Sequence, residues 1–113
     1  MKEVMMCAQK LAEAILNSDV YQHMHTLEEQ VTQDEDATKA IAAYMEKRTA
    51  VEQAMRKPDI DPSQLAEAAQ ELEDVQQAMN DCPIIRDMRD AQKKYQDMMD
   101  NVNRIPVSYT HLR

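Results

Sequence analysis

The sequence predicts an all-α protein of about five helices, an elongated antiparallel helical bundle built around a long helical hairpin. The 113 residues include no glycine, phenylalanine or tryptophan, so tight turns with positive φ and strand bulges lack the residue they usually need. Apolar residues recur at alternating spacings of four and three, the period of amphipathic helices. Prolines stand where two of these stretches end, which marks corners between helices.

The hairpin is predicted from residues 37–57 and the stretch that follows them. Its first helix has apolar residues at Ala37, Ile41, Tyr44, Val51 and Met55, with Arg48 completing the series. A turn bounded by Pro58 and Pro62 follows. The second helix continues the spacing with Leu65, Ala68, Leu72, Val75, Met79 and Cys82. Two such seams joined by a short turn are expected to pack antiparallel.

The other helices are expected over about residues 3–16, 18–31 and 83–105. Val4, Ala8, Leu11 and Ile15 form the seam of the first, and Val20, Met24, Leu27 and Val31 that of the second. The last helix has the longest series, comprising Ile84, Met88, Ala91, Tyr95, Met98, Val102 and Ile105. Ser18, Asp34 or Asp36, and Asp61 are suitable N-cap residues. We expect residues 1–105 to form a single helical domain.

The charge distribution indicates which classes of molecule the protein is expected to bind. The formal net charge is −8, and this acidic balance disfavours direct nucleic-acid binding, which requires clustered basic residues. Residues 37–57 hold five basic and two acidic residues, whereas residues 58–81 hold seven acidic and none basic. These opposite charges favour the hairpin. No apolar run approaches the roughly 20 residues that cross a bilayer, and no secretory signal is evident, so we expect a cytoplasmic protein without membrane contact.

Residues that could carry chemistry are few. Cys7 and Cys82 lie far apart, without the spacing of a metal or redox motif, and are interpreted first as two reduced core thiols. His23, His25 and His111 lack the spacing of zinc ligands. There is no nucleophile motif, phosphate-binding loop or distinct pair of catalytic carboxylates. The sequence therefore predicts neither an enzyme nor a resident cofactor or metal.

A protein-binding surface is the remaining candidate site. Methionine-rich bands are common at adaptable interfaces, although a band at helical spacing can equally be core. Arg48 is the one polar residue on its seam, and we expect its partner to be an acidic residue of the fourth helix or of a second chain. We predict a homodimer or higher oligomer. The candidate interface residues are Ile41, Tyr44, Arg48, Tyr95, Met98, Met99 and Val102.

Three stretches of the sequence carry a resemblance to a known family. They are the opening LAEAI..S..Y, the acidic break before residue 37, and the corner ND.P.I..M..A, in which Pro83 begins the last helix. Over residues 4–105 the chain resembles the YlbF/YmcA family of small bacterial regulators. The resemblance implies an all-α, usually oligomeric cytoplasmic protein without catalytic residues. It also implies an accessory role in competence, sporulation and biofilm formation, through an RNA-processing endonuclease or a phosphorelay.

The same resemblance raises an alternative function and a question about the C-terminus. It implies a possible iron–sulfur or metal-carrying role, for which Cys7 and Cys82 would have to converge across a dimer or with a partner. Many relatives continue into a cysteine-rich tail, whereas this chain ends in VSYTHLR, which resembles a translated adapter sequence. We therefore expect residues 106–113 to be a non-native or disordered tail.

Overall fold

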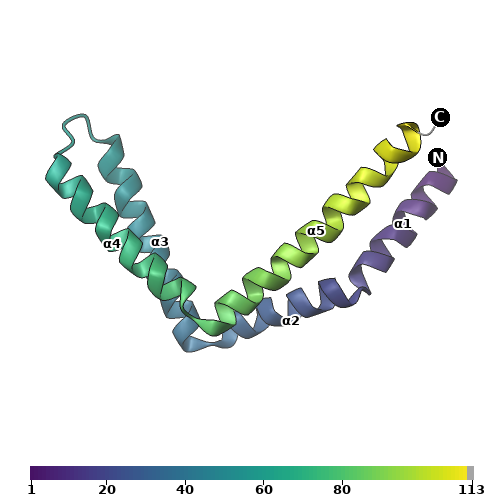
Figure 1. Ribbon diagram of the computed structural model, residues 1–113, viewed down its shortest axis with the longest axis horizontal. Helices are drawn as coiled ribbons and strands as arrows, with labels where there is room; N and C mark the ends of the chain where they lie inside the picture. Colours follow the sequence, from purple (N-terminus) through teal and green to yellow (C-terminus); the bar gives the residue numbers. More distant parts are fainter. Residues whose placement is uncertain (112–113) are drawn as a thin grey trace. The chain divides into compact units, whose positions relative to one another are not determined.

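Five helices make up the computed structural model (Figure 1), which describes the backbone of residues 1–111 and the side chains of residues 1–104. Within this part of the chain there is no strand and no residue with positive φ, which agrees with a sequence that lacks glycine. The predicted all-α fold of five helices is confirmed. The helices are α1 (Lys2–Leu16), α2 (Asp19–Gln33), α3 (Glu35–Arg56), α4 (Pro62–Asn80) and α5 (Pro83–His111).

The last helix is longer than the sequence pattern predicts. The backbone of α5 continues to His111, beyond the predicted end at Ile105. Residues 112 and 113, and all side chains from Ile105 onward, lie outside the described residues. The boundary between a helical domain of residues 1–105 and a tail of residues 106–113 therefore stays a prediction.

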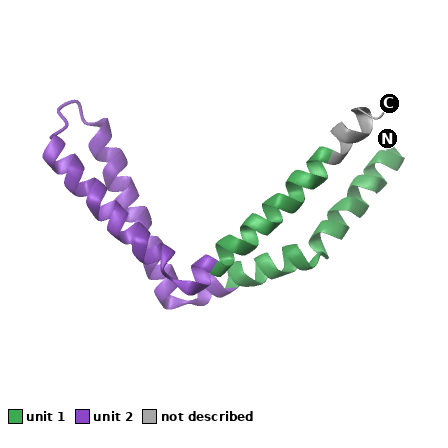
Figure 2. Ribbon diagram, viewed as in Figure 1, with its two compact units in different colours: residues 1–29, 87–113 green, residues 30–86 purple. Residues whose placement is uncertain are grey.

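Residues 30–86 form the first of two compact units to be described, coloured purple in Figure 2, and contain the predicted hairpin. Helices α3 and α4 run side by side in opposite directions. Every predicted seam position of α4 is buried or half-buried, and Met79 is 5% exposed. The hairpin prediction is confirmed, and the α4 seam is the one expected from its spacing.

The α3 seam departs from the prediction at two positions. Arg48 and Met55 are exposed, whereas their neighbours Lys47 and Ala54 are half-buried. A seam that repeats every 3.5 residues falls between the two members of each pair, so spacing alone does not select one. The packing of α3 against α4 determines which residue of each pair is half-buried. Lys47 can follow the seam with its aliphatic stem while its ammonium group stays in solvent.

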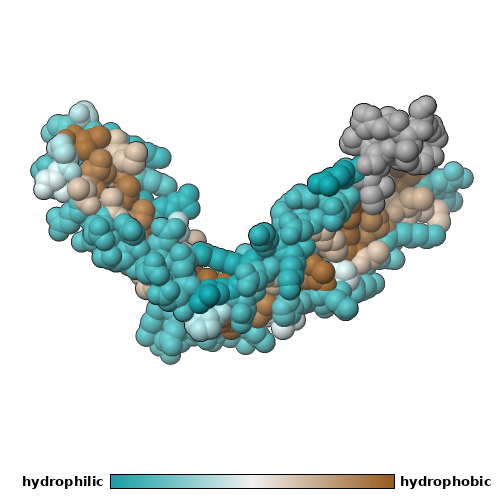
Figure 3. Space-filling view, in the orientation of Figure 1, coloured by the Kyte–Doolittle hydropathy of each residue, from teal (hydrophilic) through white to brown (hydrophobic). Residues whose placement is uncertain are grey.

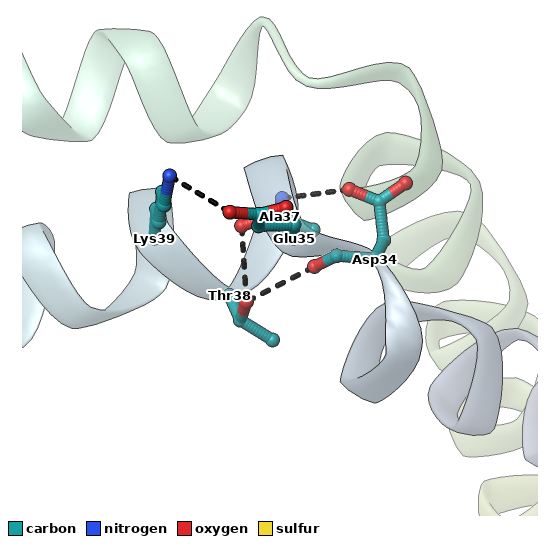
Figure 4. A network of polar contacts seen from close by, with 5 residues as sticks. All are labelled: Asp34, Glu35, Ala37, Thr38 and Lys39. Carbon is teal, nitrogen blue, oxygen red and sulfur yellow. Dashed lines mark hydrogen bonds and ion pairs between the residues drawn. The ribbon is translucent and has the colours of Figure 1, made fainter.

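Asp34 ends the linker between α2 and α3 and is the N-cap of α3 (Figure 4). Its Oδ1 accepts a hydrogen bond of 2.8 Å from the backbone N–H of Ala37, as predicted for this position. The Thr38 hydroxyl lies 3.0 Å from both the Asp34 and Glu35 carbonyl oxygens, and Lys39 pairs with Glu35 at 3.0 Å. Ala37 itself is fully buried. The Asp34 cap therefore fixes the first turn of α3, in which Ala37 is buried.

Replacing Asp34 with alanine is expected to lower the free energy of unfolding by about 1 kcal/mol, because the Ala37 N–H loses its acceptor. Urea denaturation followed by circular dichroism measures the change. Asp34→Asn keeps an acceptor and should restore most of the loss, and Asp36→Ala is the matched control within the same helical turn. Equal losses for Asp34→Ala and Asp36→Ala would show that only the negative charge near the helix start matters.

Residues 1–29 and 87–113 form the other unit, coloured green in Figure 2 where its residues are described, in which α2 packs against α5. Met24, Leu27 and Ala91 are its buried core, with Ala91 only 2% exposed. Gln92 donates a hydrogen bond of 3.2 Å to Glu28 across the pair. The half-buried residues Tyr21, Met88 and Tyr95 pack around this core. The larger side chains thus surround a small residue, Ala91, in the contact between the two helices.

Candidate protein-interaction surface

Helix α1 has an apolar face that the chain does not bury. None of its residues is buried, and of the predicted seam only Ile15 is half-buried. Val4 is 66% exposed and Leu11 is 48% exposed. The large apolar side chains left exposed at this end of the chain are Met1, Val4, Met5, Met6, Leu11 and Leu16. All of these except Met6 lie on one side of the helix, and such a group of exposed apolar side chains marks an interaction surface.

The apolar side of α1 is wide as well as exposed. At about 100° per residue, the apolar residues of α1 span an arc of roughly 200°, and Met6 is the one that lies outside it. The polar residues Lys2, Glu3, Gln9, Lys10 and Glu13 occupy the remaining arc. We call the part of the apolar arc that contains Val4, Cys7, Ala8 and Leu11 the α1 face.

The predicted α5 band divides into core and surface residues. Tyr95 packs against the Met24–Leu27–Ala91 core, with its ring 5.9 Å from that of Tyr21. Met98, Met99 and Val102 continue the same side of α5 and are half-buried. Figure 3 shows hydrophobic side chains gathered along this unit, on the side of α5 that lies next to α1. The residues of the band that remain partly exposed to solvent are therefore Met98, Met99 and Val102.

The three candidate residues on α3 belong to the other unit. Ile41 and Tyr44 are half-buried within the hairpin seam. Arg48 is exposed and pairs with Glu52 of its own helix at 3.3 Å, so the expected partner on the fourth helix is not the one found, and a partner on a second chain stays a prediction. Lys47 instead bridges the hairpin to Glu71 at 3.2 Å. Because both side chains of that bridge are partly exposed, it contributes at most about 1 kcal/mol.

The two cysteines differ in environment, and both are free thiols. Cys7 is exposed on α1, which corrects the interpretation of both cysteines as core thiols, whereas Cys82 is half-buried at the corner between α4 and α5. The prediction for Cys7 was wrong because a residue beside an apolar seam is buried only if another helix covers it. His25 pairs with Glu29 at 3.1 Å and stacks on Tyr21. Within residues 1–104, no three His, Cys, Asp or Glu side chains gather as metal ligands would.

Comparison with known protein families identifies the family of this chain. The family model described as "Control of competence regulator ComK, YlbF/YmcA" matches residues 4–106. This chain belongs to the YlbF/YmcA family. The sequence resemblance over residues 4–105 is thereby confirmed.

A solved structure has the same fold as this YlbF/YmcA member. RicA of Bacillus subtilis, solved by X-ray crystallography in complex with RicF, superposes with a TM-score of 0.86. The alignment covers 98% of this chain and 97% of that one at 19% sequence identity, a likeness of fold. No curated protein has significant sequence similarity to this chain. Among the described residues, no helix of this family member is both long and apolar enough to cross a membrane.

Proposed function

We propose that this YlbF/YmcA protein is a cytoplasmic, non-enzymatic helical adaptor that binds other proteins. Its regulatory target would be RNA processing or a phosphorelay in bacterial development, and it would not contact nucleic acid directly. The observation that carries the proposal is the uncovered apolar face of α1, a helix that buries none of its residues. Family membership and the crystallisation of RicA with RicF support the same class of function.

The physical argument concerns what a helix such as α1 needs in order to be stable. Isolated helices of about 15 residues are marginal in water, and most helical stability in proteins comes from packing an apolar face. The chain supplies little of that packing to α1, since only Ile15 is half-buried. An adaptor whose apolar face is covered in the complex gains this stability on binding.

The α5 band extends the proposed binding surface beyond α1. Met98, Met99 and Val102 are half-buried and lie in the same unit as α1. Methionine side chains adapt to different partner shapes, which suits a protein that enters more than one complex. We assign these three residues to contact with a partner protein, whereas Tyr95 packs against the core of its own unit.

The proposal is tested by chemical cross-linking and affinity purification of the full chain from its source, followed by reconstitution with the purified partner. Met99→Glu should weaken binding by about tenfold or more, because it places a charge in an apolar contact. Asn101→Glu introduces the same charge at an exposed position of the same helix and is the control. Circular dichroism checks that both variants remain helical.

Two results would contradict the proposal, one its adaptor function and the other the binding surface assigned to it. One is a chain that cross-links to no other protein under conditions where a known complex from the same source is recovered. The other is a partner that binds wild type, Met99→Glu and Asn101→Glu with equal affinity, which would remove the α5 band from the binding surface.

A further inference from the structure

The α3–α4 hairpin has no buried side chain over most of its length. Every residue from position 38 to position 78 is exposed or half-buried, and burial is reached only at Ala37, near the start of α3, and at Met79, near the end of α4. Two helices that pack on each other alone cover each apolar seam from one side, whereas a stable core is built when a further element covers the pair. The seam of this hairpin can therefore be covered further by another helix.

One side of the hairpin is bridged by an ion pair and the other is apolar. On the first side, Lys47 of α3 lies 3.2 Å from Glu71 of α4. At about 100° per residue, a set of apolar residues lies roughly 60–120° round α3 from Lys47, and another lies roughly 100–120° round α4 from Glu71 in the same sense. Because the helices are antiparallel, the same sense of rotation leads to the same side of the pair. We call this second side the hairpin face, which comprises Ile41, Tyr44, Met55, Leu65 and Leu72.

The hairpin face is only partly covered by the chain. Met55 is 60% exposed, and the other four residues of the face are half-buried. Met45, which is 61% exposed, lies next to the face about 40° round α3 from Ile41. Hydrophobic side chains are visible at the surface along this hairpin in Figure 3. Exposed apolar side chains gathered on one side of a helix pair mark an interaction surface.

The charges beside the hairpin face indicate which kind of helix fits it. α3 carries four basic and four acidic residues, whereas α4 carries four acidic residues and no lysine or arginine. Among the described residues, Glu71 is the only one of these α4 carboxylates in an ion pair, the bridge on the opposite side. Arg48, the basic residue next to the hairpin face, is already paired with Glu52 at 3.3 Å. The α4 edge of the face therefore keeps a negative charge that favours lysine and arginine in a partner.

We propose that the hairpin face binds a basic amphipathic helix of another protein. The apolar stripe of that helix packs on the hairpin face, and its basic side chains lie over α4, where Glu73 borders the face. Recognition of an amphipathic helix through apolar residues three and four positions apart is a common binding mode. A second copy of this chain, with a net charge of −8, lacks the positive charge that this edge favours.

This surface is separate from the one assigned to the adaptor function. The α1 face and the α5 band belong to the compact unit of residues 1–29 and 87–113, whereas the hairpin face belongs to the unit of residues 30–86. The inference rests on the proposed function only in that the ligand is a protein. It adds a second binding surface and the chemistry of the helix that this surface takes.

Titration of synthetic peptides into the full chain tests the proposal. Ile41 and Met55 lie about 21 Å apart along α3, so a helical peptide of about 18 residues spans the face. The probe has leucines at alternating spacings of four and three and lysines beside them, and fluorescence anisotropy of the labelled peptide measures its affinity. We expect saturable binding at micromolar concentration. The same peptide with glutamate in place of lysine, and one with the same composition but scattered leucines, should each bind about tenfold more weakly or worse.

A pair of matched variants locates the binding surface. Met55→Glu should weaken binding of the lysine peptide about tenfold, because it places a charge in the apolar contact. Gln53→Glu adds the same charge at an exposed position about 160° round α3 from Met55 and should leave the affinity unchanged. Circular dichroism checks that both variants remain helical.

Met99→Glu separates the hairpin face from the α5 band, and this variant should bind the lysine peptide as wild type does. The proposal would be overturned by a lack of saturable binding up to about 100 µM, by equal affinity for the lysine and glutamate peptides, or by binding that Met55→Glu leaves intact. Loss of binding in Met99→Glu but not in Met55→Glu would assign the peptide to the α5 band. That result would refute the hairpin face as a docking site and leave the adaptor function standing.

Discussion

Replacing Ile85 with alanine is expected to lower the free energy of unfolding by about 2–5 kcal/mol. Ile85 is 1% exposed and has the largest fully buried side chain among the described residues. Removing three of its side-chain carbons loses their transfer free energy and leaves a cavity that the surrounding residues refill only in part. Urea denaturation monitored by circular dichroism measures this loss as a lower transition midpoint.

The neighbouring isoleucine supplies the control for Ile85. Ile84 is half-buried, so Ile84→Ala removes the same atoms from a site that retains contact with water. Its loss of stability should be clearly smaller than that of Ile85→Ala. If Ile84→Ala proved the more damaging of the two, the burial assigned to the start of α5 would be wrong.

Replacing Met24 with alanine is expected to cost a similar amount, about 2–5 kcal/mol, in the unit that contains α2 and α5. Met24 is 9% exposed and forms the core of that unit with Leu27 and Ala91. Truncation removes the flexible side chain that fills the space between the two helices. The change is measured by thermal unfolding, with tyrosine fluorescence reporting on Tyr21 and Tyr95 beside the cavity.

Met45→Ala is the matched control for Met24→Ala. The same side chain is removed from a position of α3 that is 61% exposed, so the free energy of unfolding should change by no more than about 0.5 kcal/mol. Comparable losses from the two methionine variants would show that the α2–α5 core is not the one described. Both variants should be compared at the same protein concentration, because an oligomer stabilises itself by mass action.

Much of the fold could be predicted because helices are specified by local patterns. The absence of glycine, the four-three spacing and the prolines at the corners led to five helices. Residue type and place reduced the cap of α3 to Asp34 or Asp36, of which the structure has Asp34. The α4 seam was also correct, since a strongly polar helix has few apolar positions to choose from. These features depend on residues a few positions apart along the chain.

The predictions that were wrong concern residues whose burial depends on tertiary packing. Arg48 was expected on the α3 seam, but Lys47 faces α4, because a seam of 3.5 residues per repeat leaves adjacent positions equivalent until a partner helix is placed. Ile85 was absent from the predicted α5 series, although it is the most buried large side chain described. It lies in the first turn, in the compact unit of residues 30–86, whereas the series that begins at Ile84 follows the side of α5 that meets α2.

The candidate site shows the same division between local and tertiary information. The periodicity of α1 identified Val4, Ala8, Leu11 and Ile15 as one apolar seam. Only the tertiary structure showed that the chain half-buries Ile15 and leaves the other three exposed, and that Cys7 beside them is exposed as well. Sequence determines which side of a helix is apolar, because the period is local. Tertiary packing decides which apolar sides are covered, because burial depends on where the other helices lie.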